Sequence, residues 1–517
     1  MRRALTLVLA LACSAQAQQF SSVETLYSGG PKVVRFGFSK PKGTDGAGGA
    51  YLGFPSGTVG CWDLGNAKET IRGGYLFAPA SNQRFLRSSS SQPCIDGSGT
   101  PQYPISVVIW FNAADTTAGK TLLSLSDGSG ADPTPATNRL VCYTGASATL
   151  YAYVTDSGGS SHSSAASMYT ANTWVCGIWV FKSTTSRWVY SSVLTAGASE
   201  NTTSRVPVTL DYADLGAENG YTASEEWNGR IAYTAVLPVD LSGAGNSAAR
   251  TAIYAGCDPV RVAGFTYGSL TRSSDGAQGA VWKLDNDAGV DAGPHGFDLT
   301  ASGSPTAQGN LIVARDLSGG GYHVTATTAA PTYSTSIGNG QGGGVFASAS
   351  SQFLRLGSTP ITAAPFQVYA VAQANDAIAQ HTVFWLGDKD VNDDDRWILS
   401  FRGDVGSDPT RFAATDSPAL PNASINSYST DTNYLLWGSE EASNARTHER
   451  NGGSTATDST SSTPDNADSL AIGMTRDSTP ESGLDGEIHF VLLMNTASTS
   501  DQSRIEKWTS TVYALGF

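Results

Sequence analysis

The chain has 517 residues, enough for two to four domains with sizeable cores. Charged residues make up 15% of it and 57 residues are glycine, a composition that disfavours long solvated helices and favours short strands joined by turns. The formal net charge of −14 argues against nucleic acid and anionic membranes as partners, because their phosphate groups would be repelled.

The N-terminus is typical of a secretory signal peptide. Two arginines precede a nine-residue run, residues 4–12, that is apolar apart from Thr6, and Ala15-Gln16-Ala17 fits a cleavage site. This run is too short to span a bilayer, and no later stretch is apolar enough to do so. We therefore predict a signal peptide at 1–17, a secreted or cell-surface location, and no membrane insertion once the signal is removed. Residues 18–50 are rich in Gly, Ser and Lys and predict an irregular segment.

Export would place the cysteines of the mature chain in an oxidising compartment. These are Cys61, Cys94, Cys142, Cys176 and Cys257, and an odd number leaves at least one of them unpaired. Cys61–Cys94 and Cys142–Cys176 are the candidate bridges. The alternative, equally well supported, is that the cysteines are small buried residues of strands.

From about residue 51 onwards, short segments rich in Val, Ile, Tyr, Phe and Trp are separated by turns of Gly, Ser, Asn or Asp. The clearest core strand is Trp174–Phe181, and a short polar turn separates it from Arg187–Tyr190. This spacing predicts antiparallel sandwiches, in which inward-facing residues alternate along each strand. A helical run follows at Ala248–Ala255.

The second half of the chain repeats phrases of the first half in the same order. Gly229 opens a strand that is echoed at Gly486, 257 residues later. Pro104–Phe111 is echoed by Pro365–Ala372 at a similar offset. Ordered matches with one long offset predict a tandem duplication of a whole domain.

The predicted fold class is therefore all-β, with two tandem antiparallel β-sandwiches that are each closed by a short C-terminal helix. Ala280–Asp285 and Gly296–Thr300 have the pattern of a first strand and its return, so we assign them to the start of the second sandwich. After the N-terminal segments, the predicted parts are a first sandwich at 51–257, a linker with the next domain's first strands at 258–310, and a second sandwich at 311–517.

Four phrases carry a resemblance to a known superfamily: Asp316–Thr325, Gly343–Leu354, Asn172-Thr173-Trp174 and Leu484–Leu515. They resemble the concanavalin A-like or laminin-G-like jelly roll in its bacterial and phage version. The resemblance covers most of 51–257 and 280–517. It implies curved two-sheet sandwiches that bind ligands on the concave face or the rim loops. It says little about function, because the superfamily hosts lectins, adhesion modules, glycan-cleaving enzymes and virion proteins.

Catalytic machinery is not expected. Sandwich glycosidases need two carboxylates facing each other across one sugar bond, and the superfamily's hydrolases typically carry Glu-x-Asp-x-Glu on one strand. The sequence has no such run. Its adjacent pairs, Glu225-Glu226 and Glu440-Glu441, would point to opposite faces of a strand. The six histidines form no lyase-like phrase either.

One acidic stretch, residues 388–395, is the candidate metal site. Oxygen ligands at alternate positions suit Ca²⁺, and the candidate ligands are Asp388, Asp390, Asp393 and Asp395, with Asp127 as the counterpart of Asp388 in the first half. The stretch departs from the helical calcium loop, because Asp393 stands where glycine is needed. The alternative is a solvated acidic turn.

Trp397 and Arg396 follow this stretch directly and are the candidate ligand-binding residues. An exposed indole ring could stack on the C–H face of a sugar while the guanidinium donates hydrogen bonds. The alternative for Trp397 is a place in the core.

The function predicted from these features is a non-catalytic, exported or surface-displayed protein that binds glycans or mediates adhesion. The alternative is a phage or virion structural protein, such as a capsid decoration, fibre or tail component on the virion surface. The expected partners are accordingly glycans, or surface or virion proteins, and assembly into a homo-oligomer stays open.

Overall fold

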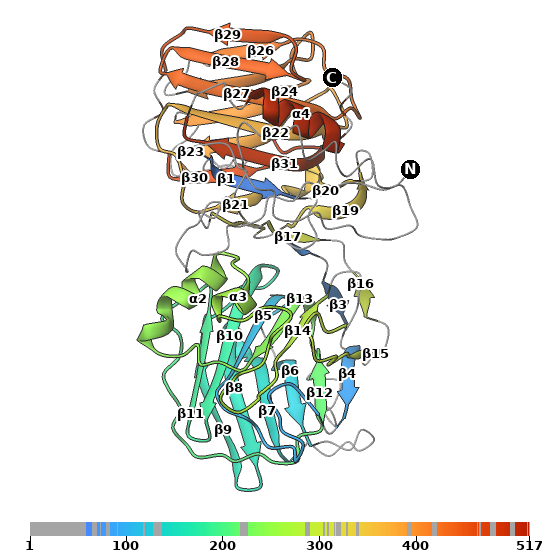
Figure 1. The fold of residues 1–517 in the computed structure, drawn as a ribbon, viewed down its shortest axis with the longest axis vertical. Helices are drawn as coiled ribbons and strands as arrows, with labels where there is room; N and C mark the ends of the chain where they lie inside the picture. Colours follow the sequence, from blue (N-terminus) through green and yellow to red (C-terminus); the bar gives the residue numbers. More distant parts are fainter. Residues whose placement is uncertain are drawn as a thin grey trace, which may run out of the picture.

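The computed structural model describes residues 58–64, 70–72, 74–78, 83–89, 91–116, 119–127, 137–217, 226–284, 290–302, 305–307, 310–314, 316, 322–326, 329–337, 341–389, 395–415, 421–462, 464, 467–475, 482–496, 502–513 and 515. The predicted signal peptide and the segment 18–50 lie outside these residues. Figure 1 shows two β-sandwiches stacked one above the other, as the repeated phrases predict.

The first sandwich consists of two antiparallel sheets, which we name 1a and 1b. Sheet 1a has the order β11 (Ser186–Ser191), β10 (Trp174–Ser183), β5 (Ile105–Ala113), β13 (Gly229–Leu237), β3 (Tyr75–Phe77) and β16 (Thr306–Ala307), with β14 (Ala280–Lys283) also paired to β13. Sheet 1b has the order β15 (Thr300–Ser302), β4 (Arg84–Ser88), β12 (Tyr212–Leu215), β6 (Lys120–Ser126), β7 (Arg139–Gly145), β8 (Thr149–Asp156) and β9 (Gly159–Ala165).

The second sandwich is built in the same way from sheets 2a and 2b. Sheet 2a has the order β19 (Thr332–Ile337), β20 (Gln341–Phe346), β31 (Gly486–Met494), β22 (Phe366–Ala374), β27 (Tyr434–Ala442), β28 (Ala445–Arg450) and β29 (Thr455–Asp458), with β1 (Thr58–Asp63) paired to β31. Sheet 2b has the order β2 (Thr70–Arg72), β17 (Leu311–Ala314), β18 (Val324–Ala326), β21 (Leu354–Leu356), β30 (Ser469–Ile472), β23 (Gln380–Gly387), β24 (Arg396–Arg402), β25 (Thr410–Thr415) and β26 (Asn422–Ile425).

The duplication predicts which strands correspond, and the pairing agrees. Strands β5, β13 and β10 lie side by side in sheet 1a, and β22, β31 and β27 repeat that arrangement in sheet 2a. The outer faces of these sheets are apolar too. On β5, Ile109 and Phe111 pack toward sheet 1b, whereas Val108 and Trp110 belong to a second cluster on the opposite side. This explains why β5 is a continuous apolar run and not a strictly alternating one.

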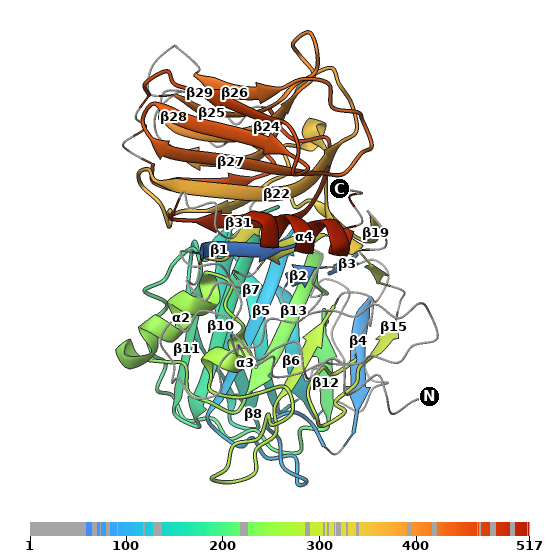
Figure 2. The same ribbon diagram turned by 45° about the horizontal axis from the view of Figure 1, so that its top comes forward.

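Short helices close both sandwiches, in agreement with the sequence. Helix α2 (Ser247–Tyr254), together with α3 (Pro259–Val262), packs on the outer side of sheet 1a. Helix α4 (Gln502–Tyr513) places Ile505 and Tyr513 against Tyr369 and Trp437 of sheet 2a. Phe490 and Leu492 of β31 belong to the same cluster, and Figure 2 shows α4 near this strand. None of the described helices is long and apolar enough to cross a membrane.

The predicted domain boundaries are wrong at both ends of the first sandwich. Strand β1 precedes the first sandwich in the chain but pairs with β31 of the second, with Trp62 opposite Val491. Strand β14 lies in the predicted linker but pairs with β13 of the first sandwich, with Trp282 opposite Thr234. The first sandwich is therefore inserted into the second.

Two tryptophans mark the same position in both sandwiches. Trp282 Nε1 donates to the carbonyl oxygen of Phe297 at 2.8 Å, and Trp62 Nε1 donates to that of Tyr322 at 2.7 Å. Both rings are fully buried. In the first sandwich the strand that carries this tryptophan, β14, follows β13 in the chain. In the second sandwich the equivalent strand, β1, precedes all the other strands and the inserted sandwich. The first sandwich is therefore circularly permuted relative to the second.

The chain crosses between the sandwiches twice, and the two crossings are neighbours. Strand β2 pairs with β17 in sheet 2b, where Arg72 lies opposite Leu311. Strand β3 pairs with β16 in sheet 1a, where Leu76 lies opposite Thr306. Incoming and outgoing chains thus form antiparallel pairs on both sides of the domain boundary.

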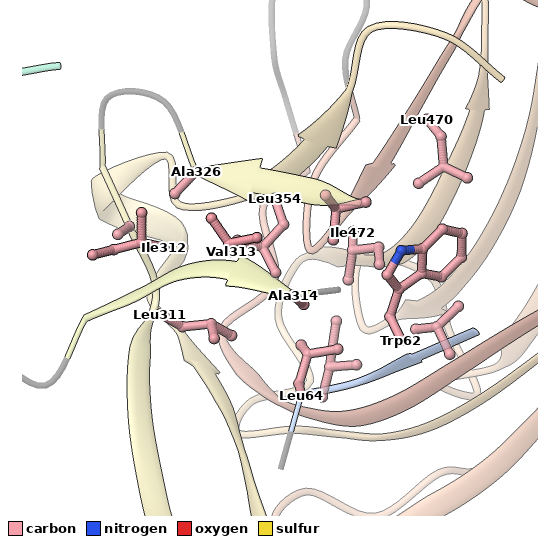
Figure 3. Packing of buried hydrophobic residues seen from close by; sticks show 14 of the residues in the cluster. Trp62, Leu64, Leu311, Ile312, Val313, Ala314, Ala326, Leu354, Leu470 and Ile472 are labelled. Carbon is pink, nitrogen blue, oxygen red and sulfur yellow. The ribbon is translucent and has the colours of Figure 1, made fainter. Parts of the chain in front are cut away.

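A shared hydrophobic cluster joins the two sandwiches. It contains Ile253 and Val260 from the helices of the first sandwich and Val313 and Val324 from the second. Figure 3 shows Trp62 packed among side chains of β17, β21 and β30 in this cluster. Continuous burial of this kind stabilises one relative placement of the two sandwiches.

The candidate disulfide Cys142–Cys176 does not form, because both residues are free. Cys142 packs between sheets 1a and 1b, whereas Cys176 points to the other side of sheet 1a. Cys94 is also free, which excludes its bridge with Cys61, and burial raises the pKa of its thiol to about 12. The alternative from the sequence, small buried residues, is the correct one for these three cysteines.

Acidification is expected to destabilise the second sandwich through His448. This residue is fully buried, with Nδ1 2.8 Å from the Trp437 carbonyl oxygen, so that Nδ1 donates, and Nε2 2.9 Å from Thr410 Oγ1. Burial lowers the pKa of His448 from 6.5 to about 4. Below pH 6.5 the unfolded chain therefore binds a proton that the folded chain does not.

The stabilisation from neutral His448 is complete above pH 6.5 and is lost as the pH falls toward 4, by about 3 kcal/mol. Denaturant unfolding at several pH values measures this slope. The variant His448→Gln should show a flatter pH dependence than the wild type. Equal slopes for the two proteins would show that another group is responsible.

Candidate functional site

The outer face of sheet 1b carries a group of aromatic side chains that starts on β8. Leu150, Ala152 and Val154 of this strand face the core, so the residues between them must face outwards. These are Tyr151 and Tyr153, and both are half-buried. An outward tyrosine keeps an apolar ring surface and a polar hydroxyl available to a ligand.

Strand pairing brings two more rings to the same place. Tyr143 of β7 lies opposite Tyr151, and His162 of β9 lies opposite Tyr153. The ring centroids of Tyr143 and Tyr151 are 6.0 Å apart, and those of Tyr151 and His162 are 4.9 Å apart. Tyr153 and His162 stack at 6.0 Å with an interplanar angle of 15°. We call these four residues the tyrosine face.

The orientation of the rings is set by their neighbours. A Cβ atom at Gly145 would lie 2.5 Å from Cε2 of Tyr151, so this ring can lie over the backbone only because residue 145 is glycine. The guanidinium carbon of Arg139 lies 5.2 Å from the centre of the Tyr153 ring, a cation–π distance. Its Nε donates to Thr155 Oγ1 at 3.2 Å, which holds it there.

The histidine of the tyrosine face is neutral at physiological pH. Partial burial lowers the pKa of His162 below its usual 6.5, and the nearby charge of Arg187 lowers it further. Neutral imidazole offers one hydrogen-bond donor and one acceptor. The face therefore combines flat aromatic surface, hydroxyl groups, an imidazole and one guanidinium.

The structure places the two predicted ligand-binding residues on opposite faces of β24. Trp397 is only 1% exposed and donates from Nε1 to Glu440 Oε2 at 2.8 Å. Its ring packs edge-on against Phe366 with centroids 5.1 Å apart. The interpretation of Trp397 as a sugar platform is therefore wrong, and its alternative, a core residue, is correct. Arg396 is half-buried on the outer side, and its ligand role stays a prediction.

The predicted calcium site is not assembled by the described residues. Asp390 and Asp393 lie outside them, and the parts described contain no group of three acidic, histidine or cysteine side chains fit for a metal. Asp388 and Asp395 are joined by a backbone hydrogen bond of 2.9 Å that closes the hairpin. Asp127 closes the corresponding hairpin in the first sandwich and accepts from Asn138 Nδ2 at 2.6 Å. Calcium stays a prediction.

The glutamate pair 440–441 behaves as its spacing predicts. Glu440 is 1% exposed and Glu441 is exposed, because neighbouring residues of a strand point to opposite faces. Glu440 pairs with buried Arg446 at 3.1 Å and therefore has a structural partner. The separation of the two carboxylates by the sheet does not suit a glycosidase pair.

A hollow of about 490 Å³ lies at the edge of the first sandwich and includes Phe265, Thr266, Ser269 and Arg272. Arg272 donates to the carbonyl oxygens of residues 102, 103, 104 and 238 and pairs with Asp275. Its guanidinium therefore holds loops together.

The tyrosine face was not predicted from the sequence, although a signal for it exists. Residues 150–154 read Leu-Tyr-Ala-Tyr-Val, in which apolar residues alternate with tyrosines. In a sandwich strand this pattern places two tyrosines outside the core. Tyr143 and His162 carry no such signal, because only the register of β7 and β9 brings them to these two rings.

No protein family and no curated protein matches the chain. Solved structures similar to it include domains LG4-5 of the mouse laminin α1 chain, with a TM-score of 0.26 and 10% identity over 88% of this chain and 93% of that one. Another is a Ruminococcus gnavus sialidase CBM40 bound to α2,3 sialyllactose, with a TM-score of 0.24 and 10% identity over 27% of this chain and 79% of that one.

A third similar structure is domain 4 of a GH43 extracellular arabinanase from Geobacillus stearothermophilus in complex with arabinotriose. Its TM-score is 0.27, with 16% identity over 34% of this chain and 81% of that one. These scores are low, so the fold assignment rests on the sheet topology described above. The structure confirms the predicted all-β fold of two antiparallel sandwiches, each built from two sheets.

Proposed function

We propose that this protein is a non-catalytic, exported glycan-binding or adhesion protein, and that the first sandwich binds sugar on its tyrosine face. The observation that carries the proposal is the continuous group of four outward rings at Tyr143, Tyr151, Tyr153 and His162. The signal-like N-terminus supports export. The described residues supply no observation that favours the virion alternative.

The chemistry of the tyrosine face suits a neutral sugar. Sugar rings have apolar C–H faces that pack on aromatic rings, while their hydroxyl groups exchange hydrogen bonds with tyrosine, imidazole and guanidinium groups. Arg139, the one cation among them, already lies over Tyr153. The net charge of −14 repels acidic glycans at long range, and this favours a neutral ligand for a face without unshielded cations.

Replacing Tyr151 by alanine is expected to weaken neutral-glycan binding by about 2 kcal/mol, roughly 30-fold in Kd, because the ring in contact with both Tyr143 and His162 is lost. A glycan array identifies the ligand, and calorimetry on the full chain measures the affinity. Tyr151→Phe should lose much less, since the ring remains.

Tyr333→Ala in sheet 2a is the matched control, because it removes a half-buried tyrosine from the other sandwich. It should leave the affinity unchanged. If Tyr151→Ala stays folded and binds the same glycan as tightly as the wild type, the tyrosine face is not the binding site.

A further inference from the structure

The outer face of sheet 2b corresponds to the tyrosine face of sheet 1b, but its residues differ. Arg396 pairs across the sheet with Thr415, as Arg139 pairs with Thr155 in the first sandwich. Counting along β25 from Thr415 then places Ala413 at the position of Tyr153 and Arg411 at the position of Tyr151. The second sandwich thus has a guanidinium where the first has a central ring.

Register places two more arginines on this outer face. Arg396 lies on β24, and Arg355 lies on β21, opposite Ala471 of β30. Between them, Trp385, Ile398 and Ala471 form a small buried apolar cluster on the same side of the sheet. We call Arg355, Arg396 and Arg411 the arginine face.

Arg411 is a buried cation whose hydrogen bonds go to neutral groups. It is 4% exposed. Its Nε donates to Ser400 Oγ at 3.2 Å and its Nη2 donates to Gln380 Oε1 at 2.8 Å. The carboxylate of Asp404, whose charge acts on Arg411, is already bound by both Nε and Nη2 of Arg402 at 2.5 and 2.7 Å.

The charge environment of Arg411 is repulsive for a cation. Burial lowers the pKa of Arg411 to about 9, and the neighbouring guanidinium groups of Arg402 and Arg396 add to this, while only Asp404 opposes it. Arg355 is half-buried, and burial lowers the pKa of its guanidinium. Two desolvated cations that have no carboxylate bound to them among the described residues are costly to the fold.

The chain has 45 acidic and 31 basic residues, so its carboxylates outnumber the cations that they could neutralise. An anion bound from solution would supply the missing charge partner, and guanidinium groups bind carboxylate and sulfate through paired hydrogen bonds. The apolar floor at Trp385 and Ile398 lowers the local dielectric, which strengthens such an ion pair.

We propose that the arginine face of the second sandwich binds the carboxylate or sulfate groups of an acidic glycan, with Arg355 and Arg411, which lie four strands apart in sheet 2b, contacting different sugar units. The two sandwiches then bind different parts of their targets: neutral sugar at the tyrosine face and acidic sugar at the arginine face. The proposal rests on the proposed function in one respect, namely that the ligand is a glycan.

The test uses the full chain and two acidic probes, an oligogalacturonate for carboxylate and a heparin-derived oligosaccharide for sulfate. Calorimetry should detect binding of one or both probes. The affinity should fall as the salt concentration rises, because the contact is ionic. The probe that binds identifies the anionic group. Arg355→Gln and Arg411→Gln should each weaken this binding about tenfold or more. Arg411→Lys should lose part of it, because the charge remains but the paired donors do not.

The neutral glycan distinguishes this proposal from the previous one. Arg355→Gln, at a half-buried position, is expected to fold normally and to bind the neutral glycan as the wild type does. Tyr151→Ala should bind the acidic probe normally. A wild-type protein that binds neither acidic probe, or an Arg355→Gln variant with unchanged acidic affinity, would overturn the arginine face and leave the tyrosine face standing. A wild-type protein that binds an acidic probe but no neutral glycan would support the arginine face and overturn the tyrosine face.

Discussion

A Trp62→Ala variant is expected to lose about 3–5 kcal/mol of stability in the second sandwich, although Trp62 precedes the first sandwich in the chain. The indole is fully buried in the cluster that contains Leu311, Ala314 and Ile472, and its Nε1 hydrogen bond to the Tyr322 carbonyl oxygen would be lost with it. The pairing of strand β1 with β31 would then be less stable. Amide hydrogen exchange should show reduced protection in β31 and β17.

Trp282→Ala is the matched control for this experiment. Trp282 occupies the equivalent position in the first sandwich and is equally buried, with its own Nε1 bond to the Phe297 carbonyl oxygen. Its replacement should reduce protection in β13, with which β14 pairs. Loss of protection in β13 on Trp62→Ala, with β31 unaffected, would mean that β1 belongs to the first sandwich and that the insertion described here is wrong.

Replacing Glu440 by alanine is expected to destabilise the second sandwich by about 3–5 kcal/mol, because it leaves Arg446 as a buried charge with half of its compensation removed. Arg446 contacts Glu440 at 3.1 Å and Asp458 at 3.0 Å, and its side chain is fully buried. Trp397 Nε1 would lose its acceptor as well. Burial raises the pKa of Glu440, since desolvation outweighs the attraction of Arg446.

The next residue provides the control for this variant. Glu441 is exposed, and Glu441→Ala should change the free energy of unfolding by less than about 0.5 kcal/mol. Replacing Glu440 and Arg446 together by leucine should cost less than Glu440→Ala alone, because no unpaired charge remains. Chemical denaturation monitored by tryptophan fluorescence measures all three. Equal stabilities for Glu440→Ala and Glu441→Ala would show that the ion pair contributes nothing.

The candidate sites show where sequence reasoning succeeds. Alternation along a strand separates Trp397 from Arg396 and Glu440 from Glu441 without any structure, because neighbouring side chains must point to opposite faces. It does not say which of the two faces is the core. Trp397 and Arg396 were nevertheless predicted to act together, against this rule, and the sheet places one inside and the other outside.

The tyrosine and arginine faces show a different limit. The alternation of Tyr151 and Tyr153 is visible in the sequence, but their contact with His162 depends on how β8 and β9 align. The correspondence between Tyr151 and Arg411 depends likewise on register, since the two hairpins differ in length and a tyrosine has no chemical likeness to an arginine. Register in a sheet is set by contacts along whole strands, which no short phrase contains.

Local pattern and repetition in the chain were enough to establish an all-β protein, its division into two related sandwiches, and the short helix that closes each of them. Only the tertiary structure decided which sandwich each edge strand joins. Strands β1 and β14 both carry a tryptophan in an apolar phrase and are locally interchangeable. Their partners are selected by pairing across the fold, and for Trp62 that partner lies more than 400 residues away. Local sequence carries no information about such a distant choice, because the free energy that decides it comes from burial in the assembled core.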